Sequence, residues 1–217
     1  MRSKRQNERG DFSTLRSSAA FILLAIAIAS TCSCGTVPAT KYYQLKPPTE
    51  VTSAPAANPL PITLLVGPLK ASHLYREDRL VYATAGEEMG TYQTHRWAQP
   101  PTEMVQELLW RSLRASGRYG SVNLLTSSSR GDFVVEGNLY DFKEISGPNL
   151  GARLNLELEL HDTKTGAIVW THACNRDEPV TGKGVPAVVA ALDEDAQNCV
   201  SEAEAGLNEY FAAHSSR

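Results

Sequence analysis

Side chains that could carry out catalytic or metal chemistry are present in this sequence, but they do not fall into a known spacing. The five histidines are scattered, without the i, i+4 spacing that places two imidazoles on one metal ion: His73, His95, His161, His172 and His214. Glu157 and Glu159 form a carboxylate pair, but their alternation puts them on the wet face of a strand. The chain contains no nucleophile elbow, phosphate loop or zinc-protease motif. The sequence therefore predicts no catalytic residues, no metal ligands and no cofactor.

Two short segments match the letters of functional motifs but lack the structural context that those motifs need. Thr181-Gly182-Lys183-Gly184 contains part of a phosphate-loop pattern, but the preceding strand and the rest of that motif are missing. We interpret this segment as a flexible loop before the last helix. Arg130-Gly131-Asp132 matches an adhesion tripeptide, and we interpret it as a turn into a strand that starts at Phe133.

Cysteine chemistry is the stronger signal, and it begins near the N-terminus. Residues 19–30 are twelve uncharged positions after a basic stretch. A twelve-residue helix rises about 18 Å, well short of the roughly 30 Å hydrocarbon core, so the segment predicts a secretory signal. The Ser33-Cys34 junction that follows resembles a bacterial lipobox, in which the cysteine thiol receives diacylglycerol and becomes the first mature residue. We favour Cys34 as the lipidated residue, with Cys32 after the β-branched Thr31 as the alternative.

Lipid attachment at Cys34 predicts how the chain is divided. Two or three acyl chains give stable anchoring. Gly35 is not the Asp that often retains lipoproteins in the inner membrane, so we expect an outer-membrane protein that faces the periplasm. A Pro-rich stretch at 47–61 predicts a tether. The expected segments are a signal peptide at 1–33, a lipidated N-terminus and tether with a short strand at 34–61, an α/β domain at 62–213 and a tail at 214–217.

The charge balance excludes one class of partner. The formal net charge of the chain is −3, but residues 1–33 carry five basic and two acidic side chains. From position 34 onward there are 16 basic and 22 acidic residues, a net charge of −6. A nucleic-acid-binding surface needs clustered Lys and Arg to contact phosphates. We therefore expect no nucleic-acid partner.

The hydrophobic pattern predicts strands, a helix, more strands and a final helix. The expected strands are 41–45, 62–66, 80–84, 91–97, 122–125, 133–145, 154–160 and 168–174. We expect the strand at 62–66 to stop at Gly67-Pro68, 80–84 and 91–97 to form a hairpin, and the last three strands to form an antiparallel meander. Helices are expected from Pro100 to Gly117 and from Pro186 to Ala213. The predicted fold is an α/β (α+β) sandwich, a single mostly antiparallel sheet with two main helices packed on one face.

The last helix carries an apolar stripe that includes a cysteine. Its members recur at spacings of three and four: Val185, Val189, Leu192, Ala196, Cys199, Ala203, Leu207 and Tyr210. Asp193, Glu194 and Asp195 are expected to lie largely off this stripe. Cys174 lies on the core-facing side of its strand, so an exported domain with this even pair predicts a Cys174–Cys199 disulfide. Two separate buried thiols are the alternative.

With these elements placed, residues 41–213 resemble the ABC-type transport auxiliary lipoprotein family, the PqiC-like proteins. Four segments carry the likeness, in chain order: Lys41-Tyr42-Tyr43-Gln44-Leu45 after the lipid cysteine, the strand at 62–68, the turn at 74–81, and His95-Arg96-Trp97-Ala98-Gln99-Pro100, which resembles an Arg-Trp-Ala-Glu-Pro segment. Gln99 replaces the usual Glu, and Glu77-Asp78 replaces a simpler turn.

The resemblance implies a non-enzymatic lipoprotein that moves lipids between the inner and outer membranes. Its implied partners are the outer membrane, through the acyl chains, and the MCE-domain protein, permease and ATPase subunits of an ABC transporter, with a homo-oligomer left open. Arg96 and Trp97 are the candidate partner-binding residues, and Trp97 is alternatively a core anchor near the helix start. The rival function is a lipoprotein scaffold that assists outer-membrane protein or lipopolysaccharide assembly, or that activates a cell-wall synthase.

Overall fold

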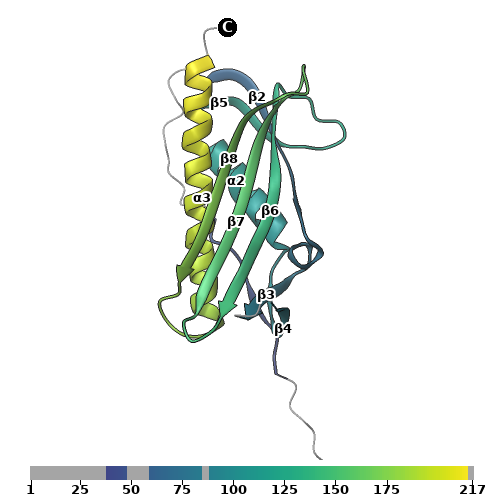
Figure 1. The fold of residues 1–217 in the computed structure, drawn as a ribbon. Helices are drawn as coiled ribbons and strands as arrows, with labels where there is room; N and C mark the ends of the chain where they lie inside the picture. Colours follow the sequence, from purple (N-terminus) through teal and green to yellow (C-terminus); the bar gives the residue numbers. More distant parts are fainter. Residues whose placement is uncertain (1–37, 48–58, 85–87, 215–217) are drawn as a thin grey trace, which may run out of the picture. The chain divides into compact units, whose positions relative to one another are not determined.

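The computed structural model describes residues 38–47, 59–84 and 88–214. From Thr40 onward the chain forms one compact unit, in which the described strands make a sheet with helices along one face (Figure 1). The elements in chain order are β1 (Lys41–Tyr43), β2 (Leu60–Ala71), the 3-10 helix η1 (His73–Arg76), β3 (Arg79–Thr84), β4 (Met89–Trp97), α2 (Pro101–Ala115), β5 (Tyr119–Leu124), β6 (Phe133–Ser146), β7 (Gly151–Asp162), β8 (Ile168–Pro179) and α3 (Val185–His214). This order and the predicted fold class are confirmed.

The long strand β6 organises the sheet. Along one edge it pairs antiparallel with β7, which pairs antiparallel with β8, so the predicted meander is confirmed. Along the other edge its first half pairs in parallel with β2 and its second half pairs in parallel with β3. On its other side, β2 pairs with β5. Strand β3 pairs with β4 in the predicted hairpin, and β4 pairs with β1. Two short groups of strands therefore share one edge of a single long strand.

Strand β2 runs further than the sequence predicted. The expected stop at Gly67-Pro68 is wrong, because the strand continues to Ala71 after a register shift between Val66 and Leu69. A bulge leaves one residue unpaired, so it accommodates a proline that has no N–H to donate. A Cβ at Gly67 would lie 3.1 Å from the Cβ of Glu136, so the glycine also permits close approach of β6.

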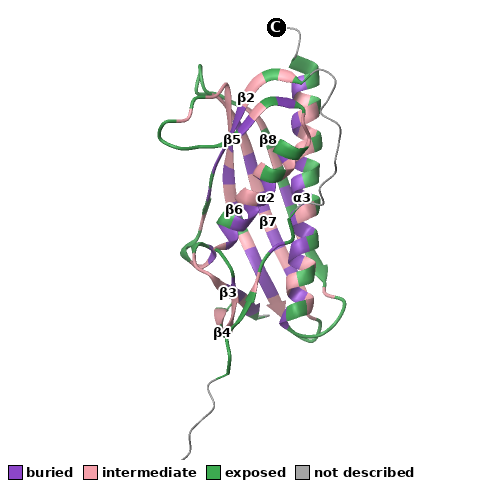
Figure 2. Ribbon diagram, turned by 180° about the vertical axis from the view of Figure 1, so that it is seen from behind, coloured by how far each residue is buried: buried purple, intermediate pink, exposed green. Residues whose placement is uncertain are grey.

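The core lies between the helices and the sheet (Figure 2). The predicted apolar residues of α2 are all buried: Met104, Val105, Leu108, Leu109 and Leu113. The alternating leucines of β7 are at most 1% exposed: Leu154, Leu156, Leu158 and Leu160. Period-two alternation in the strand and a 3.6-residue repeat in the helix thus bury matching faces, as predicted.

Helix α3 buries a wider face than the predicted stripe. Leu192, Ala196 and Cys199 are buried as expected, but Asp193 and Asp195 are only 5% and 6% exposed, so their expected exposure is wrong. The cause is that the helix is covered on more than its sheet-facing side: Asp193 is bonded to the chain just after β1, as described below. No helix among the described residues has the length and apolarity needed to cross a bilayer.

Candidate functional site

The expected lipid attachment site adjoins the described part of the chain. Cys34 and its alternative Cys32 lie outside the described residues, so acylation stays a prediction. The first described residue is Pro38, and the first strand starts at Lys41, the seventh residue after Cys34. Residues 35–40, which we call the short tether, would therefore join an acylated Cys34 to the domain at β1. The Pro-rich stretch at 47–61, predicted as the tether, follows β1, and its residues 48–58 lie outside the described residues.

Strand β1 joins two of the segments that carried the family likeness. It pairs in parallel with β4, placing Tyr42 beside Arg96 and Tyr43 beside Trp97. The N–H of Ala98 donates to the carbonyl oxygen of Tyr43 at 2.6 Å. The Tyr43 hydroxyl lies 2.9 Å from Nδ1 of His95, and the two rings are stacked. Segments about fifty residues apart in the sequence are thus one structural unit at the edge of the sheet.

The two candidate partner-binding residues have different environments. Nη1 of Arg96 donates to Oδ1 of Asp78 at 2.7 Å, and the Arg96 side chain is 27% exposed. Trp97 is fully buried, and its ring centroid lies 5.3 Å from that of Phe142. A side chain with no accessible surface cannot contact a partner, so Trp97 is a core anchor and Arg96 alone stays a candidate.

A cluster of aromatic rings lies beside this unit and one of its tyrosines bonds a buried carboxylate, a feature that the sequence reasoning missed. Glu144 is 3% exposed, and its Oε2 accepts a hydrogen bond from the Tyr92 hydroxyl at 2.8 Å. Burial and this bonded carboxylate both raise the pKa of Tyr92. The Tyr82 ring packs against Tyr92 and covers Gly90, where a Cβ would lie 2.4 Å from the Tyr82 hydroxyl. The sequence signal that could have indicated this cluster is the pair of tyrosines, Tyr82 and Tyr92, one on each strand of the predicted hairpin.

The chain after β1 is held against both helices, and we call residues 44–47 the N-terminal arm. The N–H of Lys46 donates to Oδ1 of Asp193 at 2.8 Å, and Nε2 of Gln197 donates to the Lys46 carbonyl oxygen at 2.8 Å. The Lys46 ammonium lies 3.4 Å from Oδ2 of Asp193. Leu45 is buried, and the arm and Met104 of α2 line the same groove. Both polar backbone groups of one arm residue are thus bonded to α3, which fixes the chain that follows β1 against this helix.

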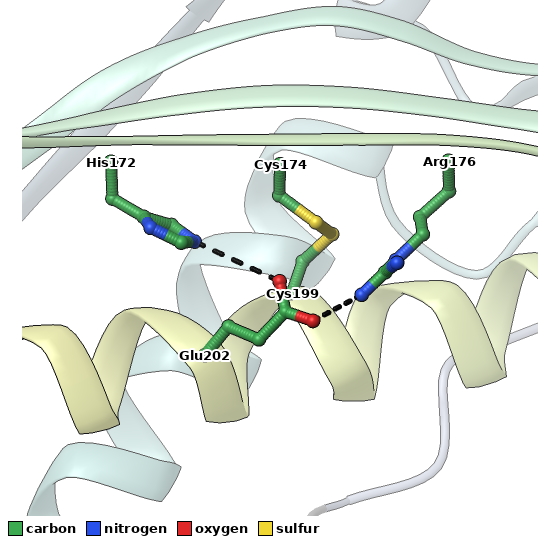
Figure 3. Close-up of a disulfide and its surroundings, with 5 residues drawn as sticks. All are labelled: His172, Cys174, Arg176, Cys199 and Glu202. Carbon is green, nitrogen blue, oxygen red and sulfur yellow. Dashed lines mark hydrogen bonds and ion pairs between the residues drawn. A yellow bond between two sulfur atoms is a disulfide. The ribbon is translucent and has the colours of Figure 1, made fainter.

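The predicted cysteine pair lies at the interface of β8 and α3 (Figure 3). The structure has Cys174 and Cys199 as a disulfide with Cα atoms 5.7 Å apart, within the usual range. Arg176 and His172 flank Cys174 on the same strand face, and both reach toward Glu202 of α3. The nitrogen–oxygen distance from His172 to Glu202 is 4.0 Å. One covalent bond and a set of ion pairs therefore hold α3 to the edge strand.

Asp195 is the most perturbed carboxyl group of this interface. Its Oδ2 is buried and finds no hydrogen-bond donor in the described part of the chain. Burial raises its pKa to about 6, and the negative charges of Glu178 and Glu194 act in the same direction, whereas Arg176 opposes them. The native state therefore disfavours the ionised form of Asp195.

Replacement of Asp195 by Asn is expected to stabilise the protein at neutral pH. The carboxyl pKa rises from 3.8 to about 6 on folding, so the native state binds the proton more tightly. The stability of the wild-type protein is then greatest below the unfolded pKa and falls as the pH rises toward 6. We expect a gain of about 1–2 kcal/mol above pH 6 that disappears near pH 4. Urea unfolding across this range measures it, and an equal gain at both ends would contradict the assignment.

Two further sequence candidates have structural partners. The His161 imidazole lies 3.0 Å from Glu159 and 3.6 Å from Glu136. Asp132 accepts the N–H of Thr63 at 2.9 Å, so the Arg130-Gly131-Asp132 segment is the predicted turn before β6. Across the described ranges, no three His, Cys, Asp or Glu side chains are grouped as a metal site.

Comparison with known proteins places this geometry in a family. A family model described as "ABC-type transport auxiliary lipoprotein component" matches residues 43–202, which run from β1 into α3 and include the Arg96–Asp78 pair and the disulfide. No curated protein is similar enough in sequence to count as a match.

Two solved structures share the fold. Protein XCC0632 from Xanthomonas campestris has a TM-score of 0.68 at 21% identity, and the alignment covers 81% of this chain and 99% of that one. A crystal structure of a protein described only as uncharacterized has a TM-score of 0.61 at 13% identity, covering 78% and 99% of the two chains. The fold agrees with these structures, and the family model covers well over half of the sequence. The chain therefore belongs to the family of ABC-type transport auxiliary lipoprotein components.

Proposed function

We propose that this protein is the outer-membrane lipoprotein subunit of an MCE-type ABC transport system that moves lipids between the inner and outer membranes. In this role it is non-enzymatic, faces the periplasm and binds the MCE-domain protein that links the two membranes. Acyl chains on Cys34 anchor it. The domain then acts as an anchored binding module that holds the outer-membrane end of the transport system.

The family match carries the proposal, since an auxiliary component of an ABC transporter acts through its transporter subunits. The position of the tether supports it. The predicted lipid site is separated from β1 by a few residues, and β1 is built into the sheet by its pairing with β4. The predicted anchor is therefore joined to the folded domain through β1, and the N-terminal arm that follows β1 is hydrogen-bonded to α3. Arg96, partly exposed beside β1, is the residue we propose for partner contact.

Affinity purification of the intact lipoprotein from detergent-solubilised membranes tests the partner. We expect the MCE-domain protein and the permease and ATPase subunits to co-purify and to be identified by mass spectrometry. An Arg96→Gln variant should recover less of them, whereas Arg130→Gln, in the turn before β6, should recover as much as the wild type. Recovery of an outer-membrane barrel or a cell-wall synthase in place of transporter subunits would favour the rival scaffold.

Replacement of Cys34 by Ala is expected to abolish lipid attachment. The apolar segment and the Ser33-Cys34 junction favour Cys34 as the acylated residue, and without its thiol no acyl chain can be transferred to it. Metabolic labelling with a radioactive fatty acid, followed by immunoprecipitation, measures the attachment. Cys32→Ala is the matched control and should label normally. Labelling of Cys34→Ala together with its loss in Cys32→Ala would move the site to Cys32.

A further inference from the structure

We propose that the end of the sheet formed by β1, β3, β4 and η1 docks onto anionic phospholipid headgroups of the membrane that holds the acyl chains. This surface, which we call the Tyr42 surface, contains the edge strand β1, with Lys41 and Tyr42 on its opposite sides, and the basic residues Arg76 and Arg79. It adjoins Arg96, which Asp78 holds and which stays the proposed partner contact. The inference rests on the proposed lipid anchor but not on the proposed transport role.

The length of the tether is the first argument. Lys41 is the seventh residue after Cys34, and a fully extended chain spans at most about 3.3–3.6 Å per residue. Strand β1 therefore lies within about 25 Å of an acylated Cys34, however the intervening residues are arranged. Because β1 is hydrogen-bonded into the sheet, the short tether also keeps the rest of the Tyr42 surface close to the anchor.

The chemistry of the surface is the second argument. Tyr42, Arg96 and Arg79 lie in one row across β1, β4 and β3, so their side chains share a face. Tyr42 is 66% exposed, and tyrosine is enriched at membrane–water interfaces because its ring is apolar and its hydroxyl is polar. Basic side chains near a membrane are attracted to anionic headgroups. The combination is that of an interfacial contact.

Neighbouring carboxylates position some of these cations without neutralising all of them. Asp78 holds Arg96 at 2.7 Å, and Glu77 lies 3.9 Å from Arg79. Lys41 and Arg76 are exposed, and neither has an ion pair among the residues that the structure describes. Two unpaired cations therefore remain available to phosphate groups.

Other surfaces are less suitable for the same contact. The open face of the sheet carries Glu136, Glu157 and Glu159, and the C-terminal half of α3 carries Glu202 and Glu209. An anionic membrane would repel both flanks. These charges disfavour an orientation in which the open sheet face or the C-terminal half of α3 lies against the membrane.

The far end of β6 is basic at Arg130 but is less well placed. Val81, two residues from Arg79, pairs with Lys143, which is ten residues after Phe133. At about 3.3 Å per residue, Arg130 lies some 25–30 Å along the strand from the Tyr42 row. Docking through that end would require a nearly fully stretched tether, so the Tyr42 surface is the favoured contact.

Hydroxyl-radical footprinting of the intact acylated protein in nanodiscs tests this orientation. One set of nanodiscs contains phosphatidylethanolamine with about a quarter phosphatidylglycerol, and the other contains phosphatidylcholine alone. We expect oxidation of Tyr42 to be roughly threefold lower on the anionic nanodiscs. Ile168, 51% exposed at the start of β8 and level with Val134 at the far end of β6, is the internal control and should be oxidised equally on both. Equal oxidation of Tyr42 on the two lipids, or protection of Ile168, would overturn the proposal.

A pair of charge variants separates docking from effects on folding. Lys41→Gln with Arg76→Gln removes the two unpaired cations and should abolish most of the lipid-dependent protection of Tyr42. Arg130→Gln should leave it unchanged. Intact-mass measurement on each sample reports acylation. An unacylated chain would count against the proposed anchor, whereas an acylated chain with an unprotected Tyr42 would count against the docking surface alone.

Discussion

Reduction of the Cys174–Cys199 disulfide is expected to lower the melting temperature by roughly 6–12 °C. The bond closes a loop with a sequence separation of 25 residues, and a loop of this size stabilises by roughly 3 kcal/mol in the chain-entropy model. For a domain of this size each kcal/mol corresponds to about 2–4 °C. The bond also joins α3 to β8, an edge strand that pairs with the rest of the sheet along one side, through β7.

Thermal unfolding with and without reductant measures the effect. The Cys174→Ser/Cys199→Ser double variant is the control: it should melt near the reduced protein and show no response to reductant. Because the apolar core between α3 and the sheet does not depend on this bond, we expect the reduced protein to stay folded at room temperature. Alkylation of the oxidised protein under denaturing conditions gives the independent count. Two labelled thiols in the mature domain would contradict the bond.

Replacement of Gly137 by Ala is expected to destabilise the protein by about 3 kcal/mol or to prevent its accumulation. A Cβ at this position would lie 1.9 Å from the backbone oxygen of Glu157, far closer than any non-bonded contact allows. Because the obstructing atom belongs to the backbone of β7, no side-chain rotation relieves the clash, and the two central strands must separate.

Gly147→Ala is the matched control for this prediction. Gly147 follows β6 directly, and the nearest atom to its added Cβ would be 3.7 Å away, an ordinary contact distance. Urea unfolding should give the control a midpoint near that of the wild type, with a much lower midpoint for Gly137→Ala. Equal midpoints for both variants would show that β6 and β7 can move apart at Gly137 without a loss of stability, which would contradict the prediction.

Local patterns in the sequence predicted the elements that rest on local physics. The leucine alternation of β7 and the helical repeat of α2 each placed an apolar face correctly, because side-chain direction follows from the backbone repeat. The hairpin of β3 and β4 and the meander were likewise predictable from strands that adjoin in the sequence. The Gly67-Pro68 stop failed because a bulge carries β2 past a residue that cannot donate a hydrogen bond.

Contacts between distant segments could not be predicted in this way. The parallel pairing of β1 with β4 depends on segments about fifty residues apart, and nothing in either one specifies the other. The different environments of Arg96 and Trp97, one partly exposed and the other buried, depend on such packing. The burial of Asp193 follows from the N-terminal arm, which bonds across about 150 residues of sequence. The helical repeat alone predicted that Asp193 is exposed to solvent.

Lipid transfer between the two membranes of living cells is the most direct test of the proposed transport function. Cells that lack the protein are pulse-labelled with a radioactive phospholipid precursor, and the label is followed from one membrane fraction to the other. We predict slower transfer, to the same extent as in cells lacking the MCE-domain protein and with no further slowing when both are absent. The wild-type gene should restore the rate, and Cys34→Ala should not. Transfer at the wild-type rate, together with a defect in outer-membrane protein assembly, would contradict the proposed function and favour the rival scaffold.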